Sequence, residues 1–228
     1  PLAIRWPKGI REPGRVFSGL VNLSDLAPTF LEAAGLAVPK MMNANSLHDI
    51  IEKQPITTRL TAFIAMERHD GCRKGGKGYP SRAIRTKDYM YILNHMPDRW
   101  PAGNPDREFC ARYIPFGEVD SSPTKTLLMD NRNKPEFQRF YDLAFAKRPA
   151  EELYDLKKDP GQINNLAGKP QYAKIQKKLS VQLQQHLKKT KDPRALGLDA
   201  PWDYYPYYGA MRNKNWAVDP KPLSRDRK

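Results

Sequence analysis

The sequence has few cysteines and no long apolar run. Only Cys72 and Cys110 occur among 228 residues, so a disulfide-stapled fold is excluded and their pairing with each other stays open. Neither stands in a metal-ligand spacing. No segment is apolar over the roughly 18 residues that a membrane-spanning helix needs, and Pro1 follows neither an initiator methionine nor a signal-peptide pattern. We therefore expect no membrane span, and further protein upstream of Pro1.

Acidic residues are few relative to basic ones. The formal net charge is +14, from 39 Lys and Arg against 25 Asp and Glu. Such a surplus attracts polyanions, among them nucleic acid, acidic membrane surfaces and sulfated polysaccharide. No zinc-finger spacing, RNP-like motif or helix-turn-helix occurs, so we expect no nucleic acid partner. Charge alone leaves open the choice between another polyanion and an unspecialised basic surface.

The apolar pattern predicts both strands and helices. The run at residues 60–66 is almost continuously apolar, which is typical of a strand buried on both faces. Residues 24–35 predict a helix with Leu26 and Phe30 on its apolar face. The predicted strands are residues 2–4, 60–66, 81–86, 89–94 and 152–156. The predicted helices are residues 24–35, 134–146 and about 170–190.

Glu67, Arg68 and His69 are the main candidate site residues. They follow the predicted buried strand directly, and ligands of open α/β sheets gather at the carboxyl ends of strands. Arg68 suits a sulfate or carboxylate on a sugar, and His69 can donate a hydrogen bond to it. An equally weighted interpretation is an ion-pair network that seals two subdomains.

Lys74, Lys77 and Arg82 are weaker candidates. The two lysines lie in a glycine-rich loop that can approach charged oxygens closely, although a solvated loop is the more frequent arrangement. Arg82 and Arg85 lie on one predicted strand, where pairing with acidic neighbours is favoured over contact with substrate. The tyrosines near the C-terminus could stack on sugar rings, but we favour a role in covering apolar surface.

Four segments carry a resemblance to a known family: residues 1–7 (PLAIRWP), 22–35 (NLSDLAPTFLEAAG), 79–86 (YPSRAIRT) and 152–166 (ELYDLKKDPGQINNL). They resemble type I, formylglycine-dependent sulfatases, in the form seen in heparan N-sulfatases, and the likeness runs to about residue 190. It implies the trailing part of an alkaline-phosphatase-like α/β sulfatase domain, followed by a small antiparallel sheet packed on a C-terminal helix.

The resemblance also implies a division of the chain. Residues 1–72 would end the catalytic α/β domain, residues 73–192 would form the C-terminal subdomain, and residues 193–228 would form an aromatic, proline-rich, basic tail. The implied partners are a sulfated glycan substrate and the missing N-terminal sulfatase domain. Related sulfatases are exported, periplasmic or lysosomal, although this chain shows no targeting signal.

The implied activity is hydrolysis of sulfate esters or N-sulfate groups, with calcium and formylglycine in the full-length parent. In this family a C-x-P-S-R motif supplies the formylglycine, but Gly78 stands where Pro80-Ser81-Arg82 would require the cysteine. No acidic cluster resembles the calcium site either. We therefore expect no catalytic residue, metal or other cofactor in this chain, and no activity from the chain alone.

Two other functions stay open. The chain could be a polyanion-binding module that uses its lysine-rich helix without catalysis. Alternatively, the parent could belong to the phosphatase or phosphodiesterase branch of the same superfamily, in which threonine or serine replaces formylglycine.

Overall fold

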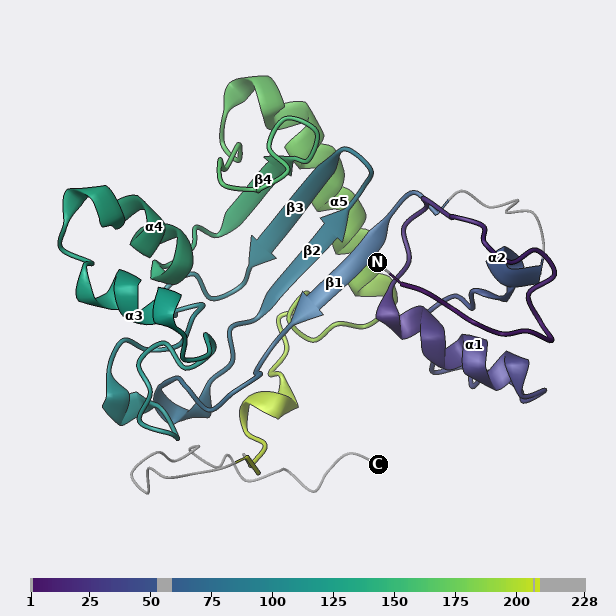
Figure 1. Ribbon diagram of the computed structural model, residues 1–228, viewed down its shortest axis with the longest axis horizontal. Helices are drawn as coiled ribbons and strands as arrows, with labels where there is room; N and C mark the ends of the chain where they lie inside the picture. The colour runs from purple at the N-terminus through teal and green to yellow at the C-terminus, as the bar shows by residue number, and fades with distance from the viewer. Residues whose placement is uncertain (1, 53–58, 207, 210–228) are drawn as a thin grey trace.

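An antiparallel sheet forms the centre of the computed structural model, which describes residues 2–52, 59–206 and 208–209 (Figure 1). The predicted basic end of the chain, from residue 210, lies outside the described residues. The strands pair in chain order: β1 (Ala62–Met66), β2 (Ser81–Arg85), β3 (Tyr89–Asn94) and β4 (Glu151–Asp155). The predicted β2–β3 hairpin is confirmed, with Ile84 opposite Tyr91. Its register is fixed by β-branched and aromatic side chains on the buried face.

The helix α5 (Ala173–Lys189) packs across β2 and β3 and confirms the predicted terminal helix (Figure 1). Leucines four residues apart fall on one side of a helix, and that side is buried against the sheet. Among the described residues, no helix combines the length and apolar character needed to cross a bilayer. The core between α5 and the sheet consists of Ile84, Tyr91, Leu153, Leu179, Leu183 and Leu187.

A second, smaller core lies beside the sheet, under α3 (Pro123–Asp130) and α4 (Pro135–Phe145) (Figure 1). Phe116 and Phe145 stack there with ring centroids 4.7 Å apart, and both are fully buried. The helix predicted at residues 134–146 is confirmed, whereas α3 was not predicted. Short 3₁₀ turns complete this part of the fold and the loops: Leu23–Asp25, Lys74–Gly76, Arg107–Phe109, Pro170–Tyr172 and Pro201–Asp203.

Ser122 caps the N-terminus of α3. Its Oγ accepts a hydrogen bond from Lys125 N over 3.1 Å, and Pro123 occupies the first turn. We expect Ser122→Ala to lower the free energy of unfolding by about 1 kcal/mol, because an amide at the helix start loses its acceptor. Urea unfolding monitored by circular dichroism measures this change. Ser121→Ala is the matched control, and an equal loss in both variants would contradict the capping role.

The N-terminal part lies beyond β1 and contains α1 (Leu26–Ala33) and α2 (His48–Glu52) (Figure 1). The predicted helix at 24–35 is confirmed, and Gly35 ends it with φ +72°. Its apolar face is not buried at Phe30, which is 64% exposed, whereas Pro28 and Thr29 are buried. Residues 2–4 do not form the predicted strand, since they pair with no described strand.

The strand β1 is also exposed where burial was predicted. Among the described strands it is an edge strand that pairs with β2 alone, and Ile64 and Met66 are 43% and 46% exposed. A continuous apolar run therefore did not mean burial on both faces here. The domain boundary expected after residue 72 falls between β1 and β2 of one sheet, and the division into subdomains stays a prediction.

Candidate functional site

Two loops meet at one end of the sheet, and the first carries most of the predicted site residues. This loop spans residues 67–80 between β1 and β2, and the second spans residues 95–119 after β3. A backbone hydrogen bond joins them, because Ala111 N donates to Gly71 O over 2.6 Å. The second loop therefore anchors the first.

The first loop folds back on itself at Gly78. A Cβ at this position would stand 2.9 Å from Arg68 N, closer than real Cβ contacts come. The chain also closes there, because Tyr79 N donates to Glu67 O over 3.3 Å. Only glycine allows this approach, so Gly78 fixes how Arg68 and His69 are presented.

His69 projects from the loop with its side chain 79% exposed. Its Nδ1 lies 2.7 Å from Glu118 Oε2 on the second loop, and this carboxylate oxygen accepts a hydrogen bond from Nδ1–H. Glu118 is itself held, because Arg73 Nη1 donates to its Oε1 over 2.8 Å. The buried Arg73 also donates to Trp100 O over 2.7 Å and to Pro101 O over 2.6 Å. His69 therefore presents an exposed imidazole whose hydrogen-bond partner, Glu118, is itself held by Arg73.

Arg68 lies next to His69 and points toward the C-terminal segment. Its Nη1 donates to Tyr205 O over 2.9 Å and to Gly76 O over 3.4 Å, and its Nη2 donates to Pro206 O over 3.4 Å. These acceptors are neutral carbonyls, so the charge of Arg68 is not balanced by a carboxylate in these contacts. An anion could replace such bonds with stronger ones.

The two weaker lysine candidates lie over aromatic rings. Lys77 Nζ is 4.7 Å from the ring centroid of Tyr204, and Lys74 Nζ is 5.4 Å from that of Phe109. These are cation–π distances. Lys77 and Arg68 therefore both contact the C-terminal segment, while Lys74 faces the second loop.

Glu67 and Arg82 turn inward and form an ion-pair cluster with the segment after α5. Arg82 Nη2 donates to Glu67 Oε1 over 2.6 Å, and its Nε donates to Asp192 Oδ2 over 2.6 Å. Arg194 Nη2 donates to Glu67 Oε2 and to Asp203 Oδ1, both over 2.8 Å. The predicted pairing of Arg82 with acidic neighbours is confirmed.

The ion-pair interpretation fits Glu67, while Arg68 and His69 face outward.

The cluster keeps its carboxylates ionised. Burial works to raise the pKa of Glu67, but hydrogen bonds from Arg194 and Arg82 outweigh it and hold that pKa below the usual range. Burial likewise opposes ionisation of Asp192, and the guanidinium of Arg82 lowers the pKa of that carboxyl. Both carboxylates therefore stabilise the fold only while they are charged.

Sequence reasoning missed Glu118 and Arg194. Glu118 lies 49 residues after His69, and Arg194 lies 127 residues after Glu67. No local pattern links residues so far apart. Arg194 does follow the Asp192-Pro193 helix stop, a signal that the chain turns there but not where it goes.

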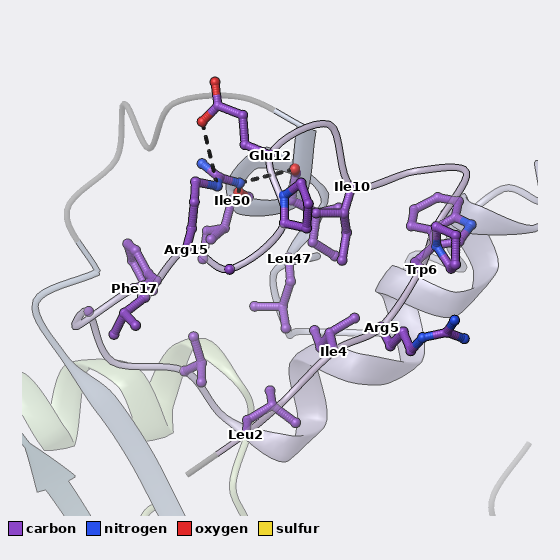
Figure 2. A pocket seen from close by; sticks show the side chains of 17 residues that line it. Leu2, Ile4, Arg5, Trp6, Ile10, Glu12, Arg15, Phe17, Leu47 and Ile50 are labelled. Carbon is purple, nitrogen blue, oxygen red and sulfur yellow. Dashed lines mark hydrogen bonds and ion pairs between the residues drawn. The ribbon is translucent and has the colours of Figure 1, made fainter.

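An apolar groove lies away from this site, in the N-terminal part (Figure 2). It has a volume of about 1070 Å³. Ile4, Ile10 and Leu47 surround it, and one wall is tied by Arg15, whose Nη2 donates to Ile50 O over 2.7 Å. Its lining is more suited to protein side chains than to a charged sugar.

Within residues 2–52, 59–206 and 208–209, no group of three or more His, Cys, Asp or Glu is placed to hold an ion. Calcium prefers six to eight oxygen ligands. The side chains described therefore do not fit calcium.

Residues 1–101 match the family described as N-sulphoglucosamine sulphohydrolase, C-terminal. This match and the sulfatase relatives together support a C-terminal sulfatase-family region in the chain. An ulvan-active sulfatase of Formosa agariphila is 29% identical over 179 residues, covering 78% of this chain and 31% of that protein. Human N-sulphoglucosamine sulphohydrolase is 27% identical over 207 residues, covering 85% of this chain and 37% of that protein.

A solved structure of a putative sulfatase from Bacteroides fragilis has a fold similar to that of this chain. The TM-score is 0.50 at 19% identity, and the likeness covers 86% of this chain and 30% of the other. The predicted fold class is thereby confirmed. The chain spans about a third of the length of the curated relatives described above.

Proposed function

We propose that the whole protein hydrolyses sulfate esters or N-sulfate groups on a glycan, and that this chain forms one wall of the substrate site. The observation that carries the proposal is the exposed His69, mounted on Glu118 beside Arg68, within a sulfatase-family region. Calcium and formylglycine are proposed for residues of the whole protein outside this chain. The chain alone is then inactive.

Arg68 and His69 supply hydrogen-bond donors for an anionic sugar. A guanidinium offers two parallel N–H groups to a sulfate or carboxylate. Because Nδ1–H of His69 is taken by Glu118, the ring adds a third donor, Nε2–H, in its imidazolium form. Bound sulfate would displace the bonds from Arg68 to Tyr205 O and Pro206 O. This chain's contribution is therefore to bind and orient the substrate.

The relatives' names support a sulfated glycan as the substrate class. One relative is named for ulvan and another for N-sulphoglucosamine. The net charge of +14 also favours long-range attraction of such a polyanion.

The apolar surface of the N-terminal part is proposed as the contact with the rest of the sulfatase. Val16 is 93% exposed and Met41 is 84% exposed, and the groove of Figure 2 opens on the same part of the chain. Exposed apolar surface of this extent is typical of an interface. The partner expected there is the catalytic domain that the relatives' greater length implies.

The test is sulfate release by the whole protein from N-sulfated and O-sulfated glucosamine, measured by ion chromatography. We expect His69→Ala to raise KM about tenfold or more, because a hydrogen bond to a charged group contributes roughly 1.5–3 kcal/mol. Lys134→Ala is the control, since Lys134 is exposed at the start of α4. A whole protein that releases no sulfate contradicts the proposed function. An unchanged KM in His69→Ala contradicts the proposed role of His69 in binding the substrate.

A further inference from the structure

We propose that Cys72 and Cys110 form a disulfide that cross-links the two loops of the candidate site. They are the two cysteines of the sequence. The structure holds both as thiols, and both are fully buried. One lies on the loop that carries His69, and the other lies on the loop that carries Glu118.

The backbone sets these residues opposite each other. Ala111 N donates to Gly71 O over 2.6 Å, and the side chains of Arg112 and Asp70 form an ion pair. Both contacts join the two loops in antiparallel order, and the next pair of residues in that order is Cys72 and Cys110. Opposite residues of antiparallel segments have Cα atoms about 4.5–5.5 Å apart, which lies within the span of a disulfide.

Two glycines make room for the sulfur atoms. An ideal Cβ on Gly117 would stand 2.7 Å from Cys72 Cβ and 2.9 Å from Cys110 Sγ, so the two cysteine side chains border the same point. An ideal Cβ on Gly103 would stand 2.8 Å from Cys72 Sγ, and this glycine has φ +94°. Both glycines therefore leave room for the two cysteine side chains.

The reaction is an ordinary thiol–disulfide exchange with a low-molecular-weight disulfide such as oxidised glutathione. One cysteine thiolate attacks the reagent and releases one glutathione thiol, and the second cysteine then attacks the mixed disulfide and releases the other. The two cysteines lose two protons and two electrons, and the reagent is reduced to two thiols. Because burial raises the pKa of the Cys72 thiol, the bond forms while the loops fold, before burial is complete.

The cross-link fixes the distance between the loop of His69 and the loop of Glu118. The hydrogen bond from His69 Nδ1 to Glu118 spans the same two loops only three residues along from Cys72. Its bearing on substrate binding rests on the proposed function. The bond itself does not, because it follows from the loop geometry alone.

Peptide mapping of the whole protein tests the bond. The protein is refolded with oxidised and reduced glutathione, denatured in iodoacetamide and cut with trypsin. Cleavage after Arg68, Arg73, Arg107 and Arg112 releases the peptides 69–73 and 108–112. We expect these two peptides as one cross-linked species by mass spectrometry, and its complete loss when the sample is reduced first.

Cys110→Ser is the matched control, in which peptide 69–73 should be alkylated without prior reduction. Singly alkylated peptides 69–73 and 108–112 from the oxidised wild-type protein would overturn the proposal, as would glutathione on either peptide in place of the link. A link confined to a dimer band on a non-reducing gel would also overturn it. None of these outcomes depends on sulfate release, so the disulfide and the proposed function succeed or fail separately.

Discussion

Replacing Arg82 by methionine is expected to lower the free energy of unfolding by about 3 kcal/mol. Its side chain is only 2% exposed and binds both Glu67 and Asp192. Removing one partner of a buried ion pair costs about 3–5 kcal/mol. The lower end applies, because Glu67 keeps Arg194 and both carboxylates retain some contact with water. Methionine keeps most of the side-chain volume, so the loss reports on charge and hydrogen bonding.

Arg85→Met on the same strand is the matched control. The structure gives Arg85 no ion pair with a described residue, so its replacement should change the free energy of unfolding by less than about 0.5 kcal/mol. Urea unfolding of both variants at pH 7 measures the difference. Equal changes in the two variants would contradict the importance of the cluster.

Acid provides a second readout of the same cluster. The pKa values of Glu67 and Asp192 are lowered in the folded state from 4.5 and 3.8, so their contribution is fully present above those values. It is lost as pH falls through the lower, folded-state values. Arg82→Met should therefore flatten the dependence of stability on pH below about 4.5. A variant as acid-sensitive as the wild type would show that other groups dominate.

The sheet and its covering helix could be predicted because their signals are local. Alternation of apolar side chains defines β2 and β3, and the leucines of α5 repeat at helical spacing. The exposure of β1 could not be predicted in the same way. Apolarity specifies that a strand avoids water, but not whether the covering surface belongs to this part of the chain.

The candidate site was likewise predictable only where its signals are local. The position of Glu67, Arg68 and His69 after a strand is a local signal, and in the structure these residues directly follow β1. The difference in their roles is set by remote partners, because Arg194 draws Glu67 inward while Glu118 holds His69 at the surface. Periodicity carries no information on contacts of this kind.

Lys125 links the small helical core to the candidate site. Its Nζ donates to Phe116 O over 2.9 Å and to Val119 O over 2.7 Å, and Glu118 lies between these two residues. Desolvation by burial lowers the pKa of this lysine. The ammonium group thus fixes the turn that presents Glu118 to His69.

We expect Lys125→Met to lower the free energy of unfolding by about 2–3 kcal/mol, because two partly or fully buried carbonyls lose a charged donor. Lys134→Met is the control, since Lys134 is exposed at the start of α4. Urea unfolding measures stability, and KM of the whole protein measures the site. Loss of stability with KM unchanged would limit Lys125 to the helical core, whereas a rise in KM matching that of His69→Ala would show that the turn at residues 116–119 positions the imidazole.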